Sequence, residues 1–207
     1  MFKQENHFIT LESAPKNARD SQTTSVVLTA LRIATKSRHT ILDSSMPLAK
    51  LDASWADYIS HLQLLAAWLV PLETWLAQYD DGPQTSKILE PICYSDLILS
   101  DLGENNYPAK FSPLGKANWP QNSDAAYRWG ISYVVEGSQL GGEFLYKRLA
   151  NRFEPHELRY LQSKQPGRWP KFVHSIAIGV ITKEEITDAC KGAVDAFDAL
   201  LQLQQEL

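Results

Sequence analysis

The stretch EGSQLGG, residues 136–142, places Gly137, Gly141 and Gly142 within six residues of a longer run that has helical periodicity. Each glycine in a helix interior is unfavourable by roughly 1 kcal/mol relative to alanine. The three together cost on the order of 3 kcal/mol, against a typical total stability of about 5 to 15 kcal/mol. This cost predicts that the missing side chains serve a purpose in the fold.

Gly130 extends the pattern, because Gly130, Gly137 and Gly141 follow one another at spacings of seven and four residues. These spacings put the three glycines on one helix face and strip that face of side chains over about two turns. Either another helix packs closely against the smooth face, or a flat ligand lies against it. The spacing alone leaves both interpretations open.

The first half of the chain also has helical patterns. Residues 24–45 repeat apolar side chains at steps of three and four, and Pro47 ends the pattern. Ser54 with Asp57 is typical of a helix N-cap and its third-position partner. The apolar helical spacing that follows predicts a long, mostly buried second helix, with a kink at Pro71.

The second half continues in the same way. One or two short helices are expected around a break at Pro91, and residues 122–124 can cap the helix that carries the glycines. We expect a short helix after Pro155. Thr182 and Glu185 form a capping box for a last amphipathic helix that ends near residue 205.

These patterns predict an all-α fold of six to eight helices, since the sequence contains no Asn-Gly hairpin signal, alternating strand pattern or internal repeat. Residues 1–20 are polar and lack periodicity, so we expect a flexible N-terminal arm there. Residues 21–207 are expected to form a single all-helical domain.

The charge, the cysteine spacing and the lack of long apolar runs exclude several classes of partner. The chain has 207 residues and a formal net charge of −4, which gives no general basic field, so nucleic acid is not an expected partner. Cys93 and Cys190 lack the spacing of a zinc site or a disulfide framework, which fits a reducing compartment. The sequence shows no apolar run of about 18 residues and no apolar centre of a signal peptide. We therefore expect a cytoplasmic protein with no membrane partner.

His39 is the candidate ligand in the first helix. It falls on the apolar stripe between Thr35 and Leu42, and Asp43 lies one turn further on at i+4. A carboxylate that holds Nδ1–H would leave Nε2 free to bind a metal, which is a usual arrangement for a metal-bound imidazole. A lone histidine on an apolar face can equally be a core residue.

These motifs resemble those of a known family. LRIATKSRHTILD, residues 31–43, resembles the proximal helix of heme oxygenases, and YVVEGSQLGGEFL, residues 133–145, resembles their glycine-rich distal helix. The similarity continues into GRWPKF, residues 167–172, and covers residues 24–207. It is strongest to the bacterial branch, which includes the biliverdin-producing enzymes that supply bilin to phytochromes. The resemblance implies a heme oxygenase-like multi-helix bundle with heme between the proximal and distal helices.

The resemblance also implies roles for individual residues. His39 matches the axial heme and iron ligand, and Asp43 matches the acidic partner of that histidine. Gly137 and Gly141 match the distal glycines, whose backbone would steer the oxygen bound to the heme iron toward one meso carbon, and Gly142 continues the same wall. The resemblance then explains why the helix keeps glycines that lower its stability, because side chains at these positions would clash with the porphyrin.

At Ser138 the sequence differs from part of the family. Animal-type members have an aspartate directly after the first distal glycine, where it orders water above the iron. Serine can also order water, with one donor and two acceptor sites, but it carries no charge. Some bacterial members lack the aspartate too, so the resemblance places Ser138 among the candidate catalytic residues without assigning it the aspartate's role.

The two heme propionates call for cations or phenols at the mouth of the pocket. Arg32 matches a family position often occupied by a propionate-binding lysine, and Tyr133 matches a tyrosine used in this way in the bacterial branch. Arg148 is a further candidate, and Arg168 and Lys171 are weaker ones that can equally be surface charges. His61 and His174 are assigned no ligand role.

The implied activity is oxidative cleavage of heme to biliverdin, carbon monoxide and ferrous iron, with heme as both cofactor and substrate and O2 as co-substrate. The implied partners are an electron donor, such as a ferredoxin or a flavin reductase, and a bilin-binding photoreceptor as product acceptor. Two alternatives stay open. One is a non-catalytic heme carrier or sensor on the same fold, and the other is a helical interaction domain in which the glycines serve packing alone.

Overall fold

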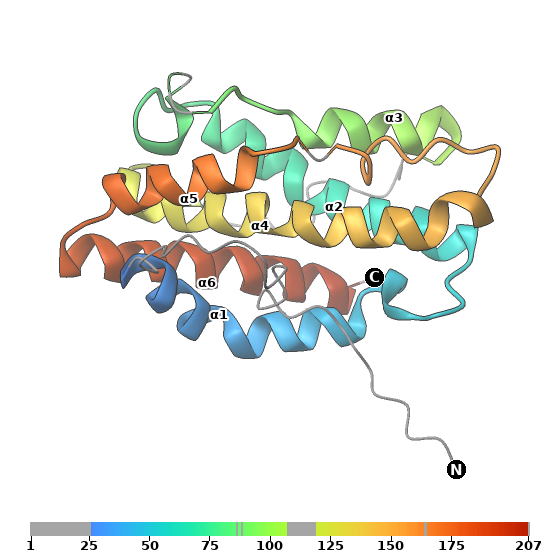
Figure 1. Cartoon of the computed structure of the whole chain (residues 1–207), viewed down its shortest axis with the longest axis horizontal. Coiled ribbons are helices and arrows are strands. Elements are labelled where there is room, and N and C mark those ends of the chain that lie inside the picture. Colours follow the sequence, from blue (N-terminus) through green and yellow to red (C-terminus); the bar gives the residue numbers. More distant parts are fainter. Residues whose placement is uncertain (1–25, 86, 88, 107–118, 164, 207) are drawn as a thin grey trace, which may run out of the picture.

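Every long regular element in the described part of the chain is an α-helix (Figure 1). The computed structural model describes residues 26–85, 87, 89–106, 119–163 and 165–206. In these ranges it has six α-helices and three short 3-10 helices and no strand, which confirms the expected all-α class. The expected arm at residues 1–20 lies outside the described residues.

Helix α1 spans Val26–Ser45, and the 3-10 helix η1 spans Pro47–Ala49. The helix ends before Pro47 as expected, because proline has no backbone N–H with which to continue the helical hydrogen bonds. The buried face of α1 consists of Val27, Leu28, Leu31, Thr35 and Leu42. His39 and Asp43 lie at the edge of this face and are half-buried.

Helix α2 spans Trp55–Leu76 and begins with the expected capping box. The Asp57 N–H donates to the Ser54 hydroxyl at 3.2 Å, and the Ser54 N–H donates to the Asp57 carboxylate at 2.8 Å. These two bonds satisfy backbone donors that the first turn leaves unpaired. The helix continues through Pro71 to its end.

Helix α3 spans Tyr94–Asn106, after the 3-10 helix η2 at Gly82–Gln84. The break expected around Pro91 is found, but in the described residues on its N-terminal side only η2 is helical. Gly103 interrupts α3 with a φ of +63°, a backbone conformation that glycine adopts without steric cost.

Helix α4 spans Ala125–Leu149 and is followed by the 3-10 helix η3 at Ala150–Arg152. The short helix expected after Pro155 is wrong: residues 156–158 have no regular structure, and residues 159–162 form hydrogen-bonded turns. Their backbone is held instead by a carboxylate on α3, a long-range partner that local sequence cannot reveal.

Helix α5 spans Arg168–Gly179, and helix α6 spans Lys183–Glu206. The expected capping box opens α6, because the Glu185 N–H donates to the Thr182 hydroxyl at 3.1 Å and the Thr182 N–H donates to the Glu185 carboxylate at 2.8 Å.

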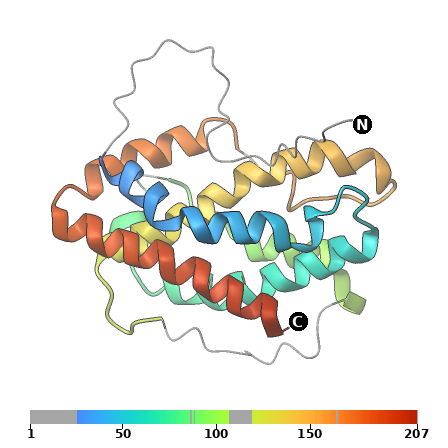
Figure 2. The same cartoon turned by 90° about the horizontal axis from the view of Figure 1, so that it is seen from below.

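Helix α6 positions the two helices that carry the candidate site residues. Both α1 and α4 pack extensively on α6, and they scarcely contact each other. Figure 2 shows α1 and α6 running side by side, with α4 beyond α1. The space between α1 and α4 is therefore open to a ligand, and α2 closes it from a third side.

Two features are absent from the described residues. No helix there is long and apolar enough to cross a membrane. No group of three or more histidine, cysteine, aspartate or glutamate side chains is placed there to hold a metal ion.

Candidate functional site

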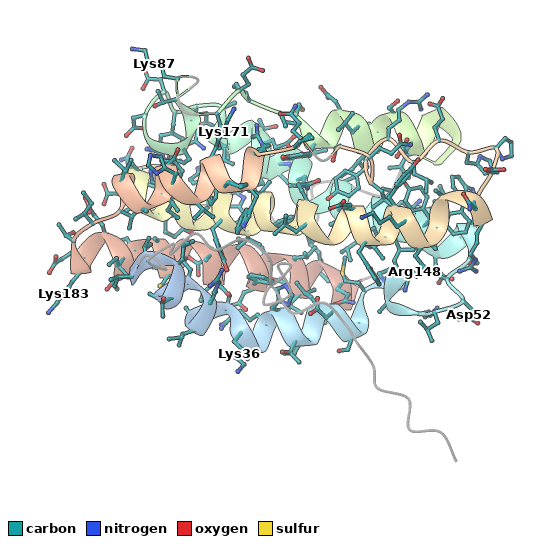
Figure 3. The ribbon with its side chains drawn as sticks, in the orientation of Figure 1. Lys36, Asp52, Lys87, Arg148, Lys171 and Lys183 are labelled. Atoms are coloured by element: carbon teal, nitrogen blue, oxygen red, sulfur yellow. The ribbon has the colours of Figure 1, made fainter. Side chains whose placement is uncertain are left out.

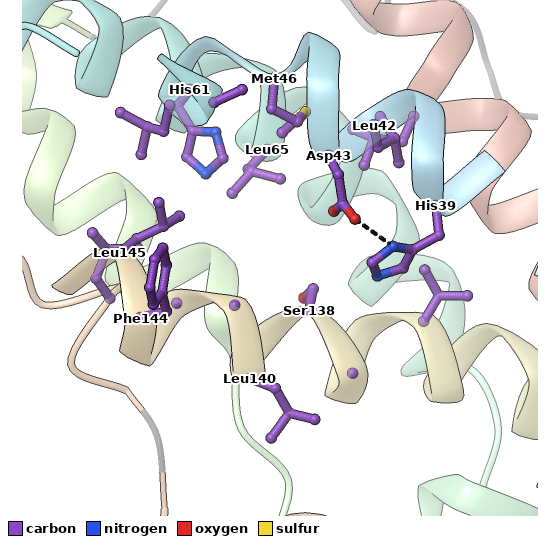
Figure 4. A pocket seen from close by; sticks show the side chains of 18 of the residues that line it. His39, Leu42, Asp43, Met46, His61, Leu65, Ser138, Leu140, Phe144 and Leu145 are labelled. Atoms are coloured by element: carbon purple, nitrogen blue, oxygen red, sulfur yellow. Dashed lines mark ion pairs between the residues drawn. The ribbon is translucent and has the colours of Figure 1, made fainter. Parts of the chain in front are cut away.

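A cavity of about 220 Å³ lies between α1, α2 and α4 (Figure 4). Its wall is mostly apolar, with contributions from η1, α6 and the turns after α4. The apolar lining comprises Leu42, Met46, Leu48, Ala49, Leu65, Trp68, Val134, Leu140, Phe144, Leu145, Leu161, Phe197 and Leu200. Such a wall favours a large apolar ligand held by a few polar contacts.

His39 projects from α1 toward α4 at one end of this cavity (Figure 4). Its Nδ1 lies 2.8 Å from the Asp43 carboxylate, and the ring packs against Phe197 with centroids 6.0 Å apart. The carboxylate fixes the proton on Nδ1, so Nε2 carries a free lone pair. The expected His39–Asp43 pair is therefore present, and its imidazole can bind a metal.

The glycines of α4 divide into two groups with different roles. A β-carbon on Gly130 would lie 1.8 Å from the Ala189 carbonyl oxygen of α6, so Gly130 permits close helix packing. A β-carbon on Gly141 would meet no atom within 4 Å, and those on Gly137 and Gly142 would meet only ordinary contacts. All three of these glycines line the cavity, whereas Gly130 does not.

The packing interpretation of the glycine face is confirmed at Gly130, and the ligand interpretation stays a prediction for Gly137 and Gly141. Helix packing accounts for Gly130, and the expectation that it belongs to a ligand-facing surface is wrong. No neighbour in the described structure requires a glycine at Gly141. A ligand in the cavity would supply that reason.

Ser138 lines the cavity from α4 (Figure 4). Its hydroxyl donates to the Val135 carbonyl oxygen at 2.7 Å and accepts from Gln139 Nε2 at 3.1 Å. A hydroxyl has one hydrogen, so Ser138 retains acceptor capacity toward the cavity but no donor in this geometry.

Tyr133 lines the same end of the cavity as His39, and its side chain is only 2% exposed. Its hydroxyl has no hydrogen-bond partner of normal geometry. Burial raises the pKa of Tyr133, while the nearby charge of Arg32 lowers it. Arg32 itself is exposed on α1 and is not among the residues that line the cavity, so the predicted cation lies near the buried Tyr133 phenol but outside the lining.

Arg148 lines the opposite end of the cavity, where its guanidinium donates to the Leu48 carbonyl oxygen of η1. Burial and the neighbouring Arg152 lower the pKa of Arg148. Tyr133 and Arg148 are fifteen residues apart on α4, which corresponds to about 22 Å along the helix axis. The candidate anion-binding groups therefore lie at two different ends of the cavity.

The two weaker candidates lie outside the cavity lining. Arg168 forms a bidentate ion pair with Glu136 at 2.6 and 2.7 Å. Lys171 is exposed on α5, far from Arg148 in Figure 3.

His61 of α2 was not expected at the site but points into the cavity (Figure 4). The side chain is 6% exposed, and its Nδ1 has no hydrogen-bond partner. Burial lowers the pKa of His61 to about 4, so the ring is neutral at neutral pH. In the sequence His61 is a polar residue within a long, mostly apolar helix, and nothing in this pattern predicts that it faces the cavity.

Tyr160 also lines the cavity and was missed by the sequence analysis. It lies in the turns after α4, and it is 4% exposed. Only the folded chain brings it beside Ser138 and Gln139 of α4.

Comparisons with known proteins agree with this geometry. The family model described as heme oxygenase matches residues 25–206. A heme oxygenase from Xanthomonas campestris pv. campestris is 31% identical over 142 residues, which are 66% of this chain and 79% of that protein. The heme oxygenase of Neisseria meningitidis, solved with NO and CO bound, has a similar fold, with a TM-score of 0.65 and 22% identity over 87% of this chain and 90% of that one.

Proposed function

Because the chain belongs to the heme oxygenase family, we propose that it cleaves heme to biliverdin, carbon monoxide and ferrous iron with O2 and external electrons. The observation that carries the proposal is the placement of the His39 imidazole, held by Asp43 through Nδ1, in an apolar cavity that Gly141 also lines. A flat, apolar, metal-centred ligand fits such a donor set.

His39 would bind the heme iron through Nε2. The Asp43 carboxylate lies 2.8 Å from Nδ1 and accepts its hydrogen bond, which keeps the ring in one tautomer and one orientation and makes Nε2 a stronger ligand. Phe197 packs against the ring and restricts its rotation.

The glycine wall would lie on the opposite face of the heme. Backbone at Gly137 and Gly141 can approach the macrocycle where a side chain could not. When bound, heme supplies the iron that activates O2 and the ring that is oxidised. The protein's contribution is to leave room on one side only, so that oxygen is directed toward one meso edge.

Arg32 and Tyr133 form the propionate end in this proposal. The two propionates leave the same edge of the macrocycle, so Tyr133 and Arg148, about 22 Å apart along α4, cannot both hold them. We assign the propionates to the Tyr133 end, because the exposed Arg32 lies near enough to that buried phenol for its charge to act on it. Arg148 then closes the far end through its bond to Leu48.

The described glycine side of the cavity presents hydroxyls rather than carboxylates. Ser138 and Tyr160 line it, while Asp43 is paired with His39. Neutral groups can order water there without adding a strong acid or base.

Electrons would come from a ferredoxin or a flavin reductase, and a bilin-binding photoreceptor would accept the product.

A second candidate function is a heme carrier or sensor that does not turn heme over. The observation that favours it is the hydroxyl of Ser138, whose hydrogen goes to the Val135 carbonyl instead of the cavity. Under this candidate the glycine wall would serve binding alone.

Aerobic turnover distinguishes the two functions. The heme complex is mixed with ascorbate and an iron chelator in air, and the Soret band and the pigments formed are followed by absorption and chromatography. Loss of the Soret band with formation of biliverdin and carbon monoxide is the expected result. A Soret band that persists under these conditions would identify a carrier and contradict the oxygenase.

A further inference from the structure

His61 is a polar side chain in a mostly apolar part of the cavity wall. It shares one face of α2 with Leu65 and Trp68, and all three residues line the cavity. His61 is 6% exposed, and its Nδ1 has no hydrogen-bond partner in the described structure. An apolar side chain of similar size would close the wall without leaving a buried polar atom unpaired. The imidazole therefore calls for a partner inside the cavity.

The His61 ring lies at the end of the cavity away from His39 (Figure 4). The two rings point into the same cavity from different helices, His39 from α1 and His61 from α2. Tyr133, to which the proposed function assigns the propionates, lines the His39 end. A heme with its propionates at Tyr133 would therefore present its opposite edge toward His61.

Heme offers no hydrogen-bonding group at that opposite edge, which carries only methyl and vinyl substituents. Ring opening there leaves two lactam rings in the product, each with a carbonyl oxygen beside an N–H. Burial lowers the pKa of His61 to about 4, so at neutral pH the imidazole is neutral and has one donor nitrogen and one acceptor nitrogen. Whichever nitrogen carries the hydrogen, a lactam presents the complementary group.

We propose that His61 is a binding residue for the ring-opened tetrapyrrole and forms a hydrogen bond with a lactam group that heme lacks. This inference rests on the proposed function, since it assumes heme in the cavity with its propionates at the Tyr133 end. His39 and His61 then serve different ligands. His39 binds the iron of the substrate, and His61 holds the product after the iron has left.

Equilibrium binding of two ligands, without any reductant, tests this assignment. One ligand is ferric heme, followed through the Soret band. The other is the biliverdin isomer opened opposite the propionates, followed through quenching of tryptophan fluorescence, since Trp68 lines the cavity. His61→Leu is expected to weaken biliverdin binding roughly tenfold, the effect of losing one hydrogen bond. Its heme affinity is expected to stay within about twofold of the parent.

His174→Leu is the matched control, because it makes the same substitution at an exposed position of α5 outside the cavity lining. It should change neither affinity. His61→Gln keeps one donor and one acceptor on the side chain and should recover most of the biliverdin affinity. If His61→Leu fails to fold, His61→Met removes the ring nitrogens with a more flexible apolar side chain.

Three results would overturn the inference. The first is a biliverdin affinity in His61→Leu equal to that of His174→Leu. The second is an equal loss of affinity for biliverdin and for heme, which would indicate a general role in packing. The third is bound biliverdin that heme does not displace, because such biliverdin would lie outside the cavity.

The proposed function fails in a different way. A parent protein that gives no Soret band with heme, or that binds heme without turnover, contradicts the oxygenase. A parent protein that turns heme over, with a biliverdin affinity indifferent to His61, contradicts the inference alone.

Discussion

Gly130 packs so closely against Ala189 of α6 that a β-carbon on Gly130 would lie 1.8 Å from the Ala189 carbonyl oxygen. The reciprocal contact is equally close, because a β-carbon on Gly192 of α6 would lie 2.0 Å from the Tyr127 carbonyl oxygen of α4. These two glycines let α4 and α6 approach closely. The glycines that line the cavity begin two turns further along α4.

Gly130→Ala and Gly141→Ala should therefore have opposite effects on stability. Gly130→Ala forces backbone against backbone and is expected to lower the free energy of unfolding by about 3 kcal/mol or more. Gly141→Ala meets no protein atom and should raise it by up to about 1 kcal/mol, while heme affinity falls. Urea unfolding and heme titration measure both quantities. Unchanged heme affinity in Gly141→Ala would remove the ligand explanation for this glycine.

Asp43→Asn should weaken heme binding without unfolding the protein. Loss of the carboxylate frees the His39 ring and makes Nε2 a poorer ligand, so we expect a 10- to 100-fold drop in heme affinity. Asp198→Asn is the matched control, because Asp198 pairs with Arg38 at 2.6 Å on the surface and does not line the cavity. Equal affinities in the two variants would contradict the role given to Asp43.

Esterified heme tests which end of the cavity holds the propionates. The parent protein should bind heme dimethyl ester more weakly than heme, because the ester lacks the negative charges that Arg32 attracts. Arg32→Ala should lose most of this preference for the free acid, and Arg148→Ala should keep it. The reverse pattern would place the propionates at the Arg148 end.

His61 should make stability depend on pH. Its pKa is about 4 in the folded protein and 6.5 without burial, so the unfolded chain binds a proton between these values that the native state does not. Its contribution to stability is therefore complete above about pH 6.5 and is lost as the pH falls toward 4. Relative to His61→Leu, the parent should lose about 2 kcal/mol between pH 7 and pH 5. A pH-independent difference between the two in urea unfolding would show that the ring is not buried as a neutral group.

Local patterns predicted much of the fold and the contact between His39 and Asp43. The stop at Pro47 and the capping boxes at Ser54 and Thr182 depend on neighbouring residues, so the sequence alone locates them. The same holds for His39 and Asp43, which are one helical turn apart.

Contacts between distant segments could not be predicted in this way. Gly130 and Gly141 have the same helical signal, and only the approach of Ala189 separates their roles. Tyr160 reaches the cavity because Asp101 holds its backbone, some sixty residues away in the chain. Such positions depend on packing between distant segments, and the spacing of residues in the sequence does not predict that packing.

An anaerobic titration of the purified protein with heme, followed through the Soret band, tests directly whether His39 binds the heme iron. The parent protein and His174→Ala, an exposed histidine on α5, should both bind one heme with the same sharp band. His39→Ala should lose the band or bind far more weakly, and added imidazole should restore it. An unchanged band in His39→Ala would contradict the assignment of His39 as the iron ligand and the heme site built on it.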